Sequence, residues 1–339
     1  MYFRSSTLDD LLHQAITELL ALPISVKSTR GNSSELLGVM LHLENPLARL
    51  SRTETKGKPF SAIGELLWYL SASDDANFIS YYIEAYKDET VDGKTIHGAY
   101  GPRLFNFRNQ YNQVQNVLDI LRRKPSTRQA VIQLLDASDI AAKRKEVPCT
   151  CTLQFFVREQ KLHMLTHMRS NDAFKGLPHD VFAFTMMQEM LARELSLQLG
   201  DYKHFVGSLH LYESDINKAK EYLSEGYQSA SGDLFMPSIP DAQPLAVLPY
   251  LLEVEQEIRN GNIINLDNIN VNDYWKDIIR LLLVFRLIKN KNKDKNNFHN
   301  IIEEMNTDVY NTYIYKRVEA IERHEQIQHR NRKFDQKNE

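Results

Sequence analysis

The amino-acid sequence predicts an α+β protein, because helix-like and strand-like segments are mixed along the chain without a regular strand–helix–strand alternation. Residues 7–22 place leucine, isoleucine and alanine at three- and four-residue spacings, which is typical of a helix with one apolar face. Residues 152–157 and 162–167 are short strand-like runs separated by a polar turn, which predicts a β-hairpin. Residues 181–196 then return to helical spacing.

The other expected elements follow from the same patterns of apolar residues. They are strands at 36–43, 130–135 and 205–212, and helices at 60–70 and 113–123. Glu65 is the only charged residue in the strongly apolar run 60–70, and this isolation makes it a candidate functional group. The sequence shows no internal repeat and no glycine-rich phosphate loop.

After about residue 245 the pattern changes to helices alone. Amphipathic helices are expected at 246–258 and 272–288, and one or two polar helices at 299–330. Between them, the lysine- and asparagine-rich run 289–297 is expected to be a solvated loop. We therefore expect a first domain over residues 1–245 and a helical C-terminal extension over residues 246–339.

The overall composition is that of an ordinary soluble globular protein. The 339 residues are 42% hydrophobic and 25% charged, with a formal net charge of -3. This charge gives no reason to expect a nucleic acid or an anionic membrane as partner. No stretch approaches the roughly 18 consecutive apolar residues needed to cross a bilayer. We expect a cytoplasmic protein whose anion sites are local.

The chain has two cysteines, Cys149 and Cys151, one residue apart. A disulfide between such close neighbours on a strand would be strained, and two cysteines alone do not make a four-ligand zinc site. No metal site is expected, and a reducing compartment fits best. Taken alone, each thiol is most simply interpreted as a small buried hydrophobic group.

Several short motifs follow one another in an order typical of one enzyme family. They are GELLWYL at 64–70, Tyr100-Gly101, Ser126-Thr127-Arg128, Pro148-Cys149, Arg169-Ser170 with Asp172, Gly176-Leu177-Pro178 and His210-Leu211-Tyr212. Over roughly residues 28–217 the chain resembles the thymidylate synthase family, including its deoxycytidylate and cytidylate hydroxymethylases. The resemblance implies a thymidylate synthase-like mixed sheet packed with helices, here followed by the extension.

The resemblance implies that Cys149 attacks C6 of a pyrimidine nucleoside monophosphate, and that C5 receives a one-carbon unit from 5,10-methylenetetrahydrofolate. A thiolate suits this step, because it is a soft nucleophile that can push electron density from C6 to C5. Arg169 and Arg128 are expected to lower the pKa of the Cys149 thiol. Glu65 and Tyr100 are expected to relay protons, and for Glu65 a structural hydrogen bond to a helix terminus is the alternative.

By the resemblance, the phosphate of the nucleotide is expected to bind basic side chains. The resemblance implies that Arg30, Arg128, Arg169 and Ser170 are these ligands, since guanidinium groups grip phosphate with paired donors. It also implies a homodimer in which Arg128 reaches the active site of the neighbouring subunit. A solvated charge is the alternative for each arginine.

The sugar and the folate have their own expected ligands. His210 and Tyr212 alternate along one strand, so both side chains can face the same cleft. By resemblance they hydrogen-bond the sugar 3′-hydroxyl, and a buried pair satisfied within the core is the alternative. Tyr86, Asp172 and Gly176 are expected on the folate side, with Tyr86 in the place of the family's tryptophan.

Asp180 is expected to read the base. Family members that use dUMP end the Gly176-Leu177-Pro178 turn region with asparagine, which offers a donor and an acceptor to uracil. An ionised carboxylate offers acceptors only, so it would repel uracil O4 and accept from the cytosine amino group. Its charge would also favour protonation of cytosine N3. The sequence therefore favours dCMP or CMP over dUMP.

The product is expected to be a 5-hydroxymethyl nucleotide. No short C-terminal tail that could close a dry site is evident, and a wetter site lets water complete the reaction. Two alternatives stay open: a thymidylate synthase that methylates dUMP, and a non-catalytic nucleotide-binding or sensing protein.

Overall fold

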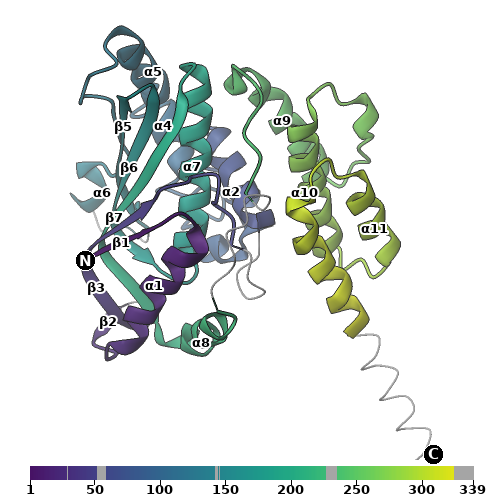
Figure 1. Cartoon of the computed structure of the whole chain (residues 1–339), viewed down its shortest axis with the longest axis horizontal. Helices are drawn as coiled ribbons and strands as arrows, with labels where there is room; N and C mark the ends of the chain where they lie inside the picture. Colours follow the sequence, from purple (N-terminus) through teal and green to yellow (C-terminus); the bar gives the residue numbers. More distant parts are fainter. Residues whose placement is uncertain (29, 52–58, 142–143, 145, 227–234, 324–339) are drawn as a thin grey trace, which may run out of the picture.

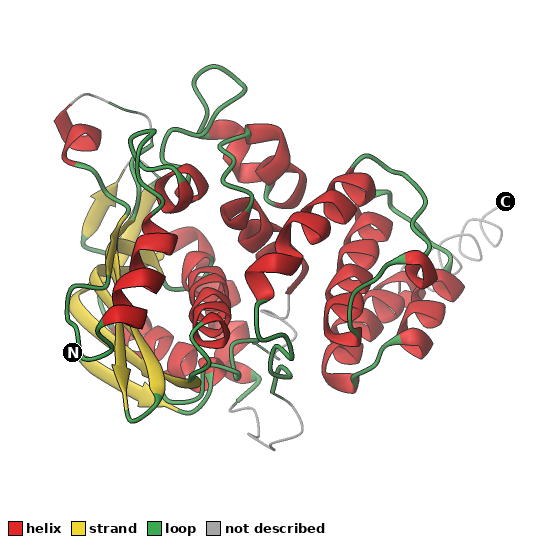
Figure 2. Ribbon diagram, turned by 90° about the horizontal axis from the view of Figure 1, so that it is seen from above, coloured by secondary structure: helices red, strands yellow, loops and turns green. Residues whose placement is uncertain are grey.

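The computed structural model of this chain describes residues 1–28, 30–51, 59–141, 144, 146–226 and 235–323 (Figure 1). A mixed sheet lies on one side of the molecule, with most of the helices between it and a helical lobe formed by the C-terminal extension (Figures 1 and 2). The predicted α+β class is confirmed. No helix within the described ranges is long and apolar enough to cross a membrane.

Over the described residues, the sheet has seven strands in the order β1-β3-β7-β6-β5-β4, with β2 paired to β3. Their bounds are Tyr2–Ser5 (β1), Val26–Ser28 (β2), Gly31–Leu43 (β3), Val131–Gln133 (β4), Thr150–Arg158 (β5), Lys161–Asp172 (β6) and Gln198–Tyr212 (β7). The β1–β3 and β6–β7 pairs are parallel and the others are antiparallel. The three long central strands β3, β7 and β6 end near one another and position most of the site.

The helices of the first part of the chain are α1 (Leu8–Ala21), α2 (Pro59–Leu70), α3 (Ala76–Tyr82), α4 (Tyr100–Phe105), α5 (Gln113–Arg123), α6 (Ala137–Ala141), α7 (Gly176–Glu194) and α8 (Ile216–Ser224), with short 3-10 turns η1 (Glu84–Asp88) and η2 (Glu213–Asp215). The extension contains α9 (Pro244–Arg259), η4 (Leu266–Asn268), α10 (Asp273–Lys289), α11 (Lys295–Glu304), η5 (Asp308–Tyr310) and helical residues 311–323. The buried helix α7 packs on β6 and β7, and α2 packs on α7.

Most expected elements are confirmed, and the differences have local causes. The hairpin turns at Glu159 and Gln160, whose φ angles of 51° and 58° fit a tight two-residue turn. Helix α7 begins at Gly176, five residues before the predicted start, because Pro178 in its first turn needs no intrahelical donor. The predicted loop 289–297 ends early, because the Asp294 side chain accepts a hydrogen bond from Asn296 and starts α11.

The extension packs closely against the rest of the chain. Helix α10 contacts α2, and α9 contacts α7. The Tyr82 hydroxyl donates to the buried Glu255 carboxylate at 2.7 Å, and the Tyr82 and Phe285 ring centroids lie 5.0 Å apart. The Tyr313 hydroxyl donates to the Ser51 carbonyl at 2.8 Å. The division into two domains at residue 245 stays a prediction.

Gly64 lets α2 approach the ring of Tyr82. A Cβ atom at Gly64 would lie 2.2 Å from Tyr82 Cγ. We expect Gly64→Ala to lower the free energy of unfolding by about 1–3 kcal/mol, although alanine favours a helix by up to about 1 kcal/mol. Denaturant unfolding measures this change. In a Tyr82→Ala background the same substitution should cost nothing, and an equal cost in both backgrounds would contradict the steric explanation.

Candidate active site

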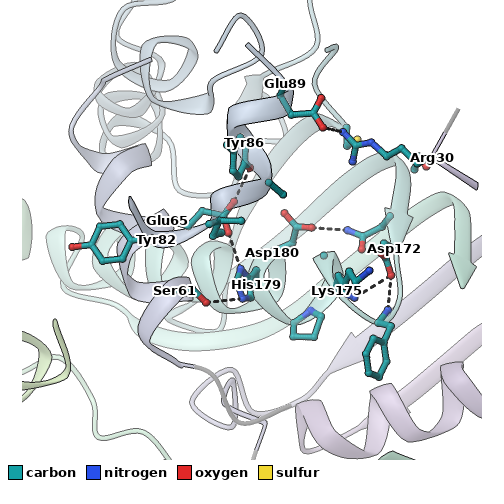
Figure 3. Close-up of a pocket in the computed structure, with 18 of the residues that line it drawn as sticks. Arg30, Ser61, Glu65, Tyr82, Tyr86, Glu89, Asp172, Lys175, His179 and Asp180 are labelled. Carbon is teal, nitrogen blue, oxygen red and sulfur yellow. Dashed lines mark hydrogen bonds and ion pairs between the residues drawn. The ribbon is translucent and has the colours of Figure 1, made fainter. Parts of the chain in front are cut away.

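A single cavity of about 950 Å³ collects most of the predicted site residues. Its wall comes from α2, η1, β6, α7, the end of β7 and the extension. The predicted residues that line it are Arg30, Glu65, Tyr86, Tyr100, Cys149, Arg169, Ser170, Asp172, Gly176, Asp180, His210 and Tyr212. Figure 3 shows Glu65, Asp180, His179 and Asp172 turned toward this space.

Cys149 immediately precedes β5 and is half-buried in the wall. Arg169 fixes this turn, because its side chain donates to the carbonyls of Pro148 at 2.9 Å and Val147 at 2.8 Å. Burial raises the pKa of the Cys149 thiol, and the charges of Arg169 and Arg30 oppose this shift without cancelling it. The expected depression of this pKa is therefore not found in the ligand-free chain.

Tyr100 is buried close to Cys149. Its hydroxyl accepts hydrogen bonds from the Thr150 backbone at 3.1 Å and the Thr150 hydroxyl at 2.9 Å. Thr150 follows Cys149, so Tyr100 holds the backbone next to the sulfur. Burial raises the pKa of the Tyr100 phenol, which keeps it protonated.

Glu65 is buried in the centre of a hydrogen-bonded group. One carboxylate oxygen accepts from Tyr69 at 2.9 Å and Tyr86 at 2.8 Å, and the other faces His179 Nδ1 at 3.0 Å. Burial, the largest single effect, raises the pKa of Glu65, whereas the hydrogen bond and charge of His179 lower it. With the two tyrosine hydroxyls added, the pKa lies below its ordinary value, so Glu65 is an ionised proton acceptor.

The pKa of Asp180 shifts in the opposite direction from that of Glu65. Burial raises its pKa well above the ordinary value, and the negative charge of Glu65 adds to the rise. Asn171 donates to one carboxyl oxygen at 2.8 Å and opposes the shift only in part. Two neighbouring carboxyl groups with opposite shifts make an acid and a base available in one site. These shifts oppose the ionised Asp180 that the sequence led us to expect, and its role in reading the base stays a prediction.

The end of the cavity near Cys149 carries the phosphate and sugar candidates. Arg30 is paired with Glu89 there (Figure 3). Ser170 Oγ lies 3.5 Å from His210 Nδ1, and the His210 and Tyr212 ring centroids are 4.9 Å apart. Both strand residues therefore face the cavity as expected.

Arg128 is exposed and does not line the cavity of this chain. Its backbone carbonyl accepts from Gln154 at 2.9 Å, which fixes the backbone while the side chain points outward. A role in the site of a second subunit stays a prediction.

The residues expected on the folate side have identifiable contacts. Asp172 accepts from the backbone amides of Phe174 at 2.8 Å and Lys175 at 3.0 Å, so one oxygen shapes the turn before α7. Gly176 begins that helix. A Cβ atom at this position would lie 3.6 Å from Asp180 Oδ2. Tyr86 donates to Glu65, as described, and lines the same cavity as Asp172 and Gly176.

The family model for thymidylate synthase matches residues 40–247. The chain belongs to the thymidylate synthase family. It is also 29% identical over 229 residues to a deoxyuridylate hydroxymethyltransferase of Delftia phage PhiW-14. That alignment covers 63% of this chain and 61% of the phage protein, so the chain matches less than two thirds of its relative's length.

Three residues of this thymidylate synthase-family site were not predicted from the sequence. His179 bridges Glu65 and Ser61, and Asn171 hydrogen-bonds Asp180. Glu146 lines the cavity and accepts from the Gly98 backbone at 2.6 Å. Its position three residues before Cys149 was a usable signal, because a carboxylate close to an expected nucleophilic thiol opposes formation of the thiolate.

The extension also contributes to the site, through Phe285, Ile288 and Arg317. All three lie beyond the residues that the thymidylate synthase family model matches. Phe285 packs on Tyr82, as described above, so this part of the wall is apolar and aromatic. Among the described residues no group of histidine, cysteine, aspartate or glutamate is arranged to hold a metal ion.

Proposed function

We propose that the protein is a 5,10-methylenetetrahydrofolate-dependent transferase that hydroxymethylates C5 of a cytosine nucleoside monophosphate, dCMP or CMP. The observation that carries the proposal is the meeting of Cys149, Glu65 and Asp180 in one cavity, where the pKa of Glu65 is lowered and that of Asp180 is raised. A nucleophile, a base and a hydrogen-bonding acid are what C5 substitution on a pyrimidine requires.

Cys149 Sγ forms a bond to C6 and loses its proton in this step. Because the pKa of the free thiol is raised, the positive charges of Arg169 and Arg30 are the groups that favour the thiolate as it attacks. The electron pair then moves toward C5, which makes that carbon nucleophilic. The bond to sulfur breaks again when the aromatic ring is restored.

Asp180 in its neutral form can read cytosine through two hydrogen bonds. Its carbonyl oxygen accepts from the exocyclic amino group, and its O–H donates to N3. Transfer of this proton to N3 leaves a carboxylate beside a protonated ring, whose C6 is more electrophilic. Asn171 fixes the carboxyl group in the required orientation.

Glu65 handles the protons that the reaction releases. It is ionised and hydrogen-bonded to Tyr86 and His179, so a proton accepted through water can be shared over this group. The carboxylate lies between the base-reading Asp180 and the aromatic wall, which suits removal of the C5 proton.

The cavity fits a second ligand beside the nucleotide. Its volume of about 950 Å³ is near the upper end of the 300–1,000 Å³ typical of ligand sites, and Trp68, Tyr86 and Phe285 offer flat apolar surface. 5,10-Methylenetetrahydrofolate, the cosubstrate of this family, would supply the methylene carbon. Tyr86, Asp172 and Gly176 are the residues proposed to hold it.

Water would provide the oxygen of a hydroxymethyl product. Glu146 lines the cavity, and burial raises its pKa, so this carboxyl is a stronger base than an exposed one. It can accept a proton from water in a site that methylation would need to keep dry. The name of the phage relative, a deoxyuridylate hydroxymethyltransferase, also favours this product.

A uracil nucleotide is the second candidate substrate, and two observations favour it. The phage relative is named for deoxyuridylate. In addition, a neutral Asp180 can accept from uracil N3–H and donate to O4, as an asparagine does.

A cytoplasmic homodimer completes the proposal. The face of the sheet away from the helices is only half-buried and carries Phe156, Leu165 and Phe205, so a second copy could cover it. Such a copy could bring Arg128, which is exposed, to the neighbouring phosphate site.

We expect the purified protein to release tritium from C5 of labelled dCMP or CMP when methylenetetrahydrofolate is present, and mass spectrometry to find a 5-hydroxymethyl product. A 5-hydroxymethyl product from dUMP would establish the second candidate. Methylated uracil with dihydrofolate release would identify a thymidylate synthase instead. Absence of turnover with all three nucleotides would contradict an enzymatic role and favour a nucleotide sensor.

A further inference from the structure

Arg317, on helical residues 311–323 of the extension, is a cation in the wall of the cavity. Its guanidinium carbon lies 5.9 Å from the centre of the Phe60 ring. Its Nε atom is buried and has no hydrogen-bond partner among the described residues. An unsatisfied buried guanidinium donor is costly, so an anion entering the cavity would be stabilised there.

The other two arginines of the cavity have partners. Arg30 pairs with Glu89, and Arg169 donates to two backbone carbonyls. Within the described ranges, no carboxylate forms an ion pair with Arg317. Arg317 therefore differs from them in facing ligand space with donors still available.

Contact with Phe60 places Arg317 at the α2 side of the cavity. Phe60, on which it packs, precedes Ser61 in α2, and Figure 3 shows Ser61 and Arg30 on opposite sides of Glu65 and Asp180. Phe285 and Ile288 of α10 line the same cavity. A ligand that reaches Arg317 must therefore extend across apolar surface away from Cys149 and end in a negative charge.

We propose that Arg317 binds the glutamate carboxylates of the folate cosubstrate, so that the extension forms the tail-binding end of the active site. This inference rests on the proposed function. The folate tail has the required chemistry, because an aromatic ring separates its reactive end from carboxylates that a guanidinium can grip with paired donors. The nucleotide phosphate is the other anion available, and it would compete for Arg317 only if bound in a reversed orientation.

Equilibrium binding by calorimetry tests this assignment without turnover. The probes are tetrahydrofolate and its bis-methylamide, in which both glutamate carboxylates are neutral, each titrated in the presence of saturating nucleotide. We expect the parent to bind the acid at least about tenfold more tightly than the amide. Arg317→Gln should remove this difference and leave binding of the amide unchanged, while Arg317→Lys should retain part of it.

Arg323→Gln is the matched control, because Arg323 is exposed on the same helix and does not line the cavity. It should behave like the parent. Equal weakening of both probes by Arg317→Gln would show a structural role and overturn the assignment, as would weaker nucleotide binding with unchanged folate binding. A parent that binds acid and amide equally also overturns it. A parent that binds neither probe contradicts the proposed function as well.

Discussion

Cys149→Ser is expected to lower kcat by a factor on the order of 10³–10⁶, since a serine hydroxyl is too weakly acidic and nucleophilic to add to C6. Nucleotide affinity should change little, because the phosphate and sugar candidates lie on other residues. Tritium release from C5 measures the loss, and calorimetry measures the binding. Mass spectrometry of the quenched parent enzyme should also find the nucleotide attached to Cys149.

Cys151→Ser provides the matched control for this prediction. Cys151 is half-buried on β5, two residues after Cys149, but does not line the cavity, and its backbone carbonyl accepts from Leu134. Its replacement should leave turnover within a few-fold of the parent. If Cys149→Ser retained the parent rate, or if Cys151→Ser lost activity equally, attack by Cys149 would be excluded.

Most residues of the cavity could be predicted from the sequence, because the motifs that contain them lie at fixed positions on neighbouring strands. Cys149, Arg169 and His210 lie at or near the ends of neighbouring strands, so a correct strand order brings them together. Alternation along β7 likewise placed His210 and Tyr212 on one face. Such positions depend on local periodicity and pairing, which a sequence pattern records directly.

The ionisation of the site could not be predicted in the same way. The raised pKa of Asp180 depends on burial and on the charge of Glu65, which lies 115 positions earlier in the chain. The lowered pKa of Glu65 depends in turn on His179. The sequence pattern marked Asp180 as a site residue, but not its neighbour His179. These shifts arise from tertiary packing between α2 and α7.

The role of the extension was hidden for a similar reason. Residues 299–330 have the composition of polar surface helices, and nothing in their spacing marks Arg317 as a cavity residue. Only the packing of α10 on α2, and of Tyr313 on the segment near Ser51, brings that helix to the active site. Long-range contacts of this kind leave no periodic signal in a sequence.

Asp180→Asn is expected to lower the preference for cytosine over uracil by at least about tenfold. An amide can still donate and accept, so uracil remains bound through two hydrogen bonds. It cannot give a proton to cytosine N3, so the more electrophilic form of that ring is lost. The ratio of kcat/KM for dCMP and dUMP measures the change. An unaltered ratio would show that Asp180 does not choose the base.

The same substitution should stabilise the folded protein at neutral pH, by about 1–2 kcal/mol. The folded-state pKa of Asp180 is raised above the ordinary 3.8, so the folded chain binds more protons than the unfolded chain between these two values. Parent stability therefore falls as pH rises through that window, whereas the asparagine variant has no such proton to lose. Denaturant unfolding should find the two proteins alike below about pH 4 and increasingly separated above it. A constant difference at all pH values would mean that Asp180 is ionised in the folded chain, and the base would then be read by a carboxylate that accepts only.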